Sequence, residues 1–261
     1  MRFLFAVVLP VCGILCFSVP ARAVSLDGLN EREKMLLNAT VEVLDPFISQ
    51  RRAAGTAPLI TFEELYSHVS PEQARFLDAF RALDPKQTGG SNRKLPAPRP
   101  ETRFVRLVQP NLAVQYVPEP AYRAYLRMMA AMEQDLGKRL LVESGYRSPA
   151  YQLYLFLFYM PNHSTSVRET NRHVALPGYS EHGSPAFQAI DFITPGGING
   201  EDRPEEFEEL QEYGWLHARA KEFGFFLSYP RPSAGSGQGE SAFEPWHWHY
   251  EAIPETAQSI S

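Results

Sequence analysis

Apolar residues recur at helical spacing in the first part of the chain. Between residues 27 and 54 they include Leu37, Val41, Leu44 and Ile48, with charged residues between them. This period predicts an amphipathic helix. The segments "TFEE" at 61–64 and "SPEQ" at 70–73 are capping-box patterns and predict two further helix starts. A small helical N-terminal region is therefore expected over residues 24–85.

The pattern changes beyond this region. Residues 86–102 are rich in glycine, proline and basic residues, which is typical of an exposed linker. The next segments alternate between strand and helix periods. Strands are expected at 103–109, 112–117, 139–144, 188–194, 225–230 and 242–251, and helices at 118–137, 148–160 and 203–224. Short connections between them predict an α+β domain over 103–261, with a small antiparallel sheet flanked by helices.

The first 23 residues form a separate kind of segment. They contain a basic Arg2, an apolar run broken by Pro10, and small residues at Ala21 and Ala23. This arrangement predicts a secretory signal peptide over 1–23. A retained membrane anchor is the alternative, which the short run and its proline disfavour.

Both cysteines, Cys12 and Cys16, lie inside the expected signal peptide. The mature chain would then have no thiol, which excludes a disulfide framework and a cysteine nucleophile.

Charge narrows the range of partners. Loss of Arg2 and Arg22, with no acid, takes the formal net charge from -5 to about -7. An acidic exported chain is a poor candidate for binding nucleic acid or anionic lipid through a general field. We therefore expect no nucleic-acid partner and no stable membrane span after cleavage of the signal. An acidic substrate would be met by a few local arginines.

The grouping of histidines with acids suggests a metal site. His182 lies close to Asp191, and His247 and His249 follow Glu244. Two histidines and one carboxylate leave a coordination position open for water, which is typical of a catalytic zinc site. A second carboxylate outside the coordination sphere can then act as the base that takes a proton from water.

Four motifs in order resemble one enzyme family. They are "SGYRSPAYQ" at 144–152, "PGYSEHGSPAFQAID" at 177–191, "GFFLSYP" at 224–230 and "EPWHWHY" at 244–250. Together they resemble the zinc D-alanyl-D-alanine carboxypeptidases and dipeptidases of bacterial cell walls. The resemblance covers roughly residues 103–253 and does not extend to the N-terminal helical region.

The resemblance implies a role for individual residues. His182, Asp191 and His247 would be the zinc ligands, and Glu244 would be the general base acting on zinc-activated water. Arg147 would bind the substrate carboxylate or stabilise the oxyanion, a role suited to a guanidinium group.

Two further positions are matched less specifically. Gln152 and Ser180 would shape the substrate pocket in the resembling family. A polar residue on a helix face and a turn hydroxyl are equally good interpretations of the same two residues.

The chain departs from the family in two places. His182 and Asp191 enclose eight residues where the family usually has six. We expect the extra pair to enlarge the turn after His182, while "QAIDF" keeps its strand register. His249 stands where the family more often has arginine, and in a strand it would point the same way as His247. We favour His247 as the ligand and His249 as a supporting or substrate-pocket residue. His163 and His173 are expected in a polar loop near the entrance, without a metal role.

The sequence thus predicts an exported zinc carboxypeptidase of the periplasm or cell-wall space that releases the terminal D-alanine of peptidoglycan stem peptides. An endopeptidase with the same zinc chemistry and a non-catalytic wall-binding module are the alternatives. A purely structural zinc ion would need a fourth protein ligand, for which His249 or His173 is the obvious candidate.

Overall fold

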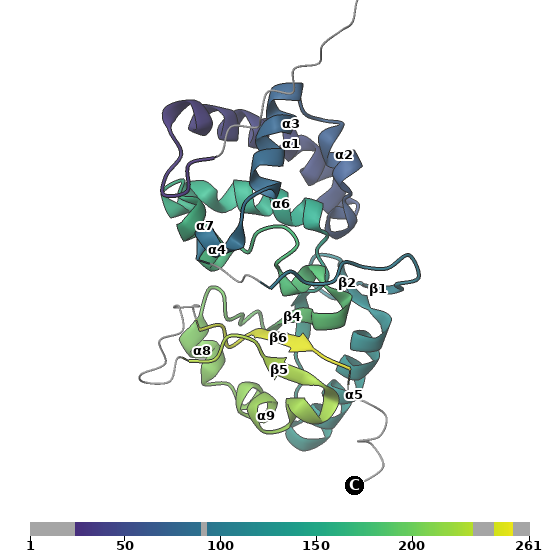
Figure 1. The fold of residues 1–261 in the computed structure, drawn as a ribbon. Helices are drawn as coiled ribbons and strands as arrows, with labels where there is room; N and C mark the ends of the chain where they lie inside the picture. Colours follow the sequence, from purple (N-terminus) through teal and green to yellow (C-terminus); the bar gives the residue numbers. More distant parts are fainter. Residues whose placement is uncertain (1–23, 90–92, 232–242, 253–261) are drawn as a thin grey trace, which may run out of the picture.

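The computed structural model describes residues 24–89, 93–231 and 243–252, which form two layers (Figure 1). One layer is helical, and the other is built on a small sheet. The expected signal peptide, with both cysteines, lies outside the described residues, as does most of the loop expected at 231–241. Within the described segments, no helix has the length and apolar character needed to cross a membrane.

The helical layer begins with three capped helices. They are α1 (Glu31–Ala53), α2 (Phe62–Tyr66) and α3 (Pro71–Arg81). Each starts with a capping box. The side chain of the residue before the helix accepts a hydrogen bond from the backbone N–H at N3, and the side chain at N3 accepts one from the backbone N–H of that first residue. The helix starts expected from "TFEE" and "SPEQ" are thereby confirmed.

Helix α6 (Pro149–Tyr159) belongs to the same layer. It runs beneath α1 to α3 (Figure 1) and shares one hydrophobic core with them. Tyr154, Phe156 and Leu157 of this helix have no solvent exposure. This placement explains why the helix is apolar almost all round. The N-terminal helices therefore cover a helix that carries one of the four motifs.

The segment after α6 corrects one expectation. Residues 161–173 were expected as a polar loop, but most of them form the 3₁₀ turn η2 (Met160–His163) and helix α7 (Val167–His173). Ser166 caps α7 by accepting a hydrogen bond from the backbone N–H of Glu169. The short length of the helix hides its apolar period in the sequence.

The expected linker at 86–102 is attached to this layer at two places. Helix α4 (Pro85–Thr88) ends in a buried threonine, whose Oγ1 accepts a hydrogen bond from Asn171 Nδ2 at 2.8 Å. Further along, the N–H of Leu95 donates to the carbonyl of Gly178 at 3.2 Å. The described parts of the segment are thus hydrogen-bonded to Asn171 within α7 and to Gly178 just after it.

The second layer is an α+β arrangement. Its antiparallel sheet has the strand order β3-β4-β6-β5, and β1 and β2 form a separate antiparallel pair. The strands are β1 (Phe104–Leu107), β2 (Gln115–Pro118), β3 (Leu141–Ser144), β4 (Gln188–Ile193), β5 (Phe225–Leu227) and β6 (His247–Tyr250). One face of the sheet packs on helices α5 (Glu119–Leu136) and α9 (Gln211–Arg219).

Alternation along the strands separates an apolar face from a polar one. Ile190, Phe192 and Trp248 are buried in the core against α5 and α9. Asp191 lies between Ile190 and Phe192, and His247 directly precedes Trp248. Because successive side chains of a strand alternate, Asp191 and His247 point to the opposite face of the sheet. The core thus fixes which residues are presented on the other side.

The single helix expected at 203–224 is wrong. The structure has α8 (Pro204–Glu208), α9 and the 3₁₀ turn η5 (Ala220–Phe223) instead. Leu210 has an extended backbone (ψ 142°) and interrupts the helix. Phe207, Tyr213 and Trp215 would lie on different sides of one continuous helix, because each residue advances by about 100°. The break allows all three to be buried.

Gly145 connects β3 to α6 at a point where a side chain would not fit. A Cβ atom there would lie 2.4 Å from the carbonyl oxygen of Tyr116. The next residue donates its N–H to that same carbonyl at 2.6 Å. The close approach of the two backbones therefore depends on glycine.

We predict that Gly145→Ala lowers the free energy of unfolding by about 2 kcal/mol, because the contact is with backbone that cannot move aside without breaking a hydrogen bond. Urea unfolding followed by circular dichroism measures the effect. Gly214→Ala is the control, since its Cβ would meet nothing within 4 Å. It lies in α9 and should raise the free energy of unfolding by about 0.5 kcal/mol. Equal effects of the two substitutions would contradict the packing argument.

Candidate metal centre and active-site cleft

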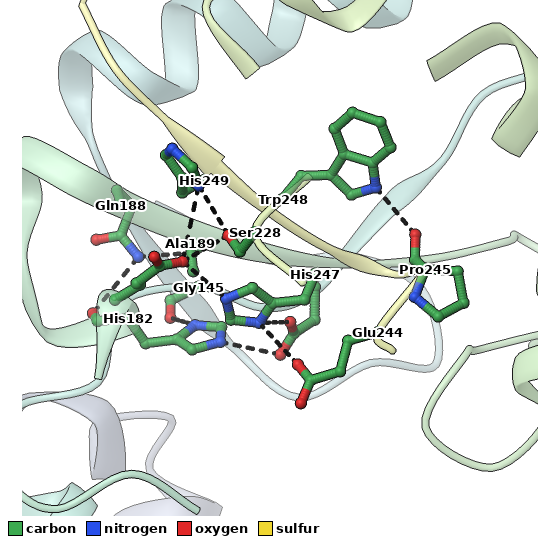
Figure 2. Close-up of polar contacts among 12 residues, drawn as sticks. Gly145, His182, Gln188, Ala189, Ser228, Glu244, Pro245, His247, Trp248 and His249 are labelled. Carbon is green, nitrogen blue, oxygen red and sulfur yellow. Dashed lines mark hydrogen bonds and ion pairs between the residues drawn. The ribbon is translucent and has the colours of Figure 1, made fainter. Parts of the chain in front are cut away.

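The register of the sheet places Asp191 opposite His247. The two residues are direct partners in the β4–β6 pair, and His247 Nδ1 lies 2.9 Å from Asp191 Oδ1. His182 enters from the 3₁₀ turn η3 (Glu181–Gly183), with its Nε2 3.1 Å from Asp191 Oδ2. One ligand atom from each of the three residues lies within 4.8 Å of the other two. Figure 2 shows the imidazoles of His182 and His247 side by side.

The eight residues between His182 and Asp191 do not disturb this geometry. They include the end of η3 and a second 3₁₀ turn, η4 (Pro185–Phe187), before β4 begins at Gln188. The structure agrees with the expectation that the additional residues lengthen the turn and leave the strand register intact.

Hydrogen bonds on the outer side of each imidazole decide its tautomer. His182 Nδ1 lies 2.7 Å from the carbonyl oxygen of Gly145, which can only accept. Nδ1 therefore carries a proton, and Nε2 directs a lone pair toward Asp191. His247 Nε2 lies 3.1 Å from Glu181 Oε2, so its donor is directed outward and its Nδ1 faces Asp191. His182 thus presents a lone pair to Asp191. Burial alone would lower the pKa of His247, but the carboxylates of Asp191 and Glu181 on its two sides raise it to about 10, so this ring is protonated at pH 7 when no metal ion is bound.

The lone pair of His182 and the carboxylate of Asp191 face one another and need a cation between them. His182 Nε2 and Asp191 Oδ1 are buried and have no hydrogen-bond partner. A proton on His247 or a metal ion would satisfy this requirement. Two imidazole nitrogens and one carboxylate oxygen, with ordered groups behind the imidazoles, are a donor set that suits zinc. The residues present therefore fit the expected ion.

The charges of the trio follow from their surroundings. Burial, with the nearby Arg147 guanidinium, lowers the pKa of His182 to about 4. His182 is therefore neutral at pH 7, as a metal ligand must be. Burial alone would raise the pKa of Asp191, but the two imidazoles hold it well below its usual range. Asp191 is accordingly ionised.

Glu244 lies beside the trio without belonging to it. It immediately precedes the turn at Pro245 and Trp246, and its Oε2 is 3.6 Å from His247 Nδ1 (Figure 2). The turn brings the side chains of Glu244 and His247 together, although they are three residues apart. Burial, with the negative charge of Asp191 nearby, raises the pKa of Glu244 to about 7. A carboxyl group with this pKa can both accept and release a proton near neutral pH.

Comparison with known proteins identifies the family of this chain. Residues 114–253 match the model of the VanY family, described as D-alanyl-D-alanine carboxypeptidase, and this match covers more than half of the chain. The chain belongs to the VanY family.

Individual relatives are more distant. A protein of Bacillus subtilis (strain 168) named "Putative carboxypeptidase YodJ" is 30% identical over 139 residues, which are 52% of this chain and 46% of YodJ. The chain thus spans less than half the length of that relative. The structure of VanYB in complex with D-Alanine-D-Alanine is 25% identical, covers 66% of this chain and 88% of its own, and has a TM-score of 0.48. The LdcB LD-carboxypeptidase structure is 27% identical, covers 62% and 70%, and has a TM-score of 0.45.

Glu181 is a residue of this VanY family member that our sequence analysis did not single out. Its Oε2 accepts hydrogen bonds from Ser228 Oγ at 2.6 Å and from His247 Nε2 at 3.1 Å. Burial alone would raise its pKa, but these contacts lower the pKa of Glu181 to about 2. It therefore stays ionised and orients His247. Its position directly before His182 was the available signal, but only the fold brings it against β6.

His249 contacts Ser228 and Glu181, the residues that hold His247 in place. Its Nδ1 lies 2.8 Å from Ser228 Oγ and 3.8 Å from Glu181 Oε2 (Figure 2). It points to the same side of β6 as His247, as its position in the strand predicts. His249 is absent from the described residues that line the cleft around the trio. The structure thus favours the supporting role over contact with substrate.

The trio opens into a cleft of about 1120 Å³ between the two layers. Arg147, Gln152 and Ser180 all line it, together with His182, Asp191, His247 and Glu244. Gln152 Nε2 donates to the carbonyl of Ala175, and its Oε1 has no partner. Arg147 Nε is likewise buried without a partner, and no described carboxylate lies within ion-pair distance of this arginine. Both residues have unused hydrogen-bonding capacity in the cleft.

The other histidines of the region do not join the trio. His163 and His173 stack on each other, with ring centroids 4.6 Å apart. His173 lines the cleft. Among the described residues, the candidate metal group contains only His182, Asp191 and His247, so the four-ligand structural site is not formed there.

We predict that Glu181→Gln weakens zinc binding at least about tenfold, because a neutral amide holds the His247 imidazole less firmly than a carboxylate. Competition with a chromophoric chelator at pH 7.5 measures the affinity. Glu251→Gln is the matched control, since Glu251 contacts His249 at 3.3 Å and makes no contact with His247 among the described residues. Zinc affinity unchanged by Glu181→Gln would show that His247 is held by other groups.

Proposed function

We propose that this chain is an exported zinc-dependent carboxypeptidase that releases the terminal D-alanine of peptidoglycan stem peptides. Membership of the VanY family supports the substrate class. The observation that carries the proposal is the convergence of His182 Nε2, His247 Nδ1 and Asp191 in a cleft, with the carboxyl group of Glu244 beside them. A metal donor set and a separate base are the two components that metal-assisted hydrolysis requires.

His182, Asp191 and His247 would hold the zinc ion. When bound, zinc supplies Lewis acidity toward a carbonyl oxygen and lowers the pKa of water. The neutral His182 and the ionised Asp191 are already in the protonation states that binding requires, whereas His247, whose pKa is raised to about 10, would release a proton on binding. Gly145 and Glu181 keep the two imidazoles in the orientation described above.

Glu244 acts as the proton shuttle. It takes a proton from the attacking water and delivers it to the amine that leaves. Its pKa of about 7 suits both steps, because the carboxylate is basic enough to accept the proton and the acid is strong enough to release it. Its distance of 3.6 Å from His247 Nδ1 keeps it close to the reacting atoms.

Arg147 binds negative charge on the substrate. Its guanidinium group lines the cleft and carries a buried Nε without a protein partner. It can meet the terminal carboxylate or the oxyanion that forms at the attacked carbonyl. Gln152 and Ser180 complete this part of the wall and shape the pocket for the terminal residue.

Export of the chain remains part of the proposal. Residues 1–23 would be removed as a signal peptide, which places the mature enzyme in the periplasm or the cell-wall space, where its substrate is found. The active site would lie in the domain over 103–261, with the region 24–85 against α6.

We predict that Glu244→Ala lowers kcat for a D-Ala-D-Ala-terminated stem pentapeptide by a factor of about 10² to 10⁴, because the proton transfer loses its base. The mature protein should retain one zinc ion per chain, since Glu244 is not among the proposed ligands. D-alanine release and zinc content by atomic spectroscopy are measured together. Glu251→Ala is the control and should leave both unchanged, because Glu251 lies just beyond the end of β6 and its ion pair is with His249, outside the trio.

Three outcomes would change the proposal. Loss of zinc from Glu244→Ala would make this residue a ligand instead of the base. A zinc-loaded wild type that cuts cross-linked stem peptides and releases no D-alanine would favour the endopeptidase. A wild type that binds wall fragments without cutting them would favour the binding module.

A further inference from the structure

We infer that Arg52, held in place by Tyr151, forms a second anion site in the cleft, which binds a carboxylate of the substrate upstream of the cleaved bond. The inference deepens the proposed function and rests on it for the identity of the substrate. It also assigns a role to the N-terminal region, which lies outside the part of the chain that matches the family.

The cleft extends well beyond the metal centre. Its volume of about 1120 Å³ exceeds the range of about 300–1,000 Å³ found for pockets that hold drug-sized ligands. A single terminal residue would fill a small part of it. The wall away from the sheet is formed by the end of α1 and the 3₁₀ turn η1 (Ala57–Leu59), through Arg52, Gly55 and Pro58. The N-terminal region is therefore part of the cleft.

The guanidinium group of Arg52 is oriented by aromatic residues of α6. Its Nε donates to Tyr151 Oη at 3.1 Å. Its central carbon lies 5.9 Å from the ring centroid of Tyr151 and 5.7 Å from that of Tyr154. Tyr154 is in turn anchored through its hydroxyl to Asp45 at 2.8 Å. These contacts restrict the guanidinium group without neutralising it, because the atoms that touch it are uncharged.

Arg52 differs from two nearby arginines because its charge is not paired with a carboxylate among the described residues. Arg51 pairs with Glu64 at 3.2 Å, and Arg172 pairs with Glu169 at 3.1 Å. In the described parts of the chain, no carboxylate lies within ion-pair distance of Arg52, and only its Nε makes a hydrogen bond. The planar edge formed by its terminal nitrogens is available to a carboxylate ligand.

The charges of the cleft are separated in space. The acidic residues Glu181, Asp191, Glu201 and Glu244 line the part near the metal centre, whereas Arg52 lies on the helical wall. Burial raises the pKa of Tyr159, and the charges of Arg52 and Arg147 both act to lower it. Tyr159 also lines the cleft, so the two guanidinium groups act on one shared space.

Two separate cationic groups suit a peptide with two carboxylates. Arg147 is adjacent to the metal centre and would meet charge at the cleaved end. Arg52 is then left for a carboxylate earlier in the peptide. Stem peptides have such a group, because one of their residues is linked through its side chain and keeps a free α-carboxylate. The arginine fork recognises a carboxylate and loses its second hydrogen bond to an amide.

The test compares two pentapeptides that end in D-Ala-D-Ala, one with the upstream carboxylate free and one with it amidated. Zinc-loaded mature wild type should prefer the free acid about tenfold in kcat/KM, mainly through KM. Arg52→Gln should lose this preference and change kcat/KM for the amidated peptide little, because the glutamine amide can still donate the single hydrogen bond that an amide accepts. Arg52→Lys should keep part of it, because it retains charge without the fork.

Arg32→Gln is the matched control. Arg32 lies on the same helix, and it is exposed and paired with Glu72 at 3.0 Å. Its loss should leave the preference of the enzyme intact. Equal losses for both peptides in Arg52→Gln, or a preference that survives the substitution, would overturn the inference.

Binding separates this inference from the proposed function. If the wild type cleaves neither peptide, the proposed activity is wrong, and calorimetric titration of both peptides into wild type and Arg52→Gln then decides about the anion site. Tighter binding of the free acid to wild type, lost in Arg52→Gln, supports the site. Equal binding of the two peptides, or no binding of either, overturns it.

Discussion

The carboxylate of Asp191 contacts the inward-facing nitrogens of two imidazoles, and the rest of the site is arranged around these contacts. The carbonyl of Gly145 accepts a hydrogen bond from His182 Nδ1, and the carboxylate of Glu181 accepts one from His247 Nε2. Both outer partners are hydrogen-bond acceptors, so the imidazole nitrogen that faces each of them must carry a proton. The inward-facing nitrogens are therefore a property of the folded chain, and a metal ion bound there would replace the proton of His247.

The fold satisfies this demand through a few long-range constraints. The β4–β6 register sets Asp191 against His247, and burial of Ile190 and Trp248 on the other face prevents a slip by one residue, which would invert both side chains. The third ligand depends on the connection after β3, where Gly145 passes against Tyr116. A loop that tolerates two additional residues can lie between His182 and Asp191, because the hydrophobic core holds the strand independently of the turn.

Sequence patterns predicted the parts of this design that are local. The capping boxes at Thr61 and Ser70 and the strand that carries Asp191 follow from short-range chemistry. The turn at Pro245 and Trp246 was not predicted, because this part of the chain was expected to be strand over 242–251. Glu181 escaped prediction, because its partners Ser228 and His247 are distant in sequence. The break at Leu210 also escaped, since the burial of residues on several sides of a helix outweighs a continuous helical period. Roles of the individual residues stay predictions until they are measured.

The relation between the two layers is the part that no motif could indicate. Helix α6 carries Gln152 toward the cleft on one side and buries Tyr154 and Phe156 among the N-terminal helices on the other. The division expected between residues 24–85 and 103–261 therefore runs through one continuous core. A helix that is apolar almost all round needs cover on every side, and in this chain α1 to α3 provide it. The same packing brings the end of α1 to the cleft, so that the N-terminal region contributes the charge of Arg52 to a site whose proposed metal ligands all come from the other layer.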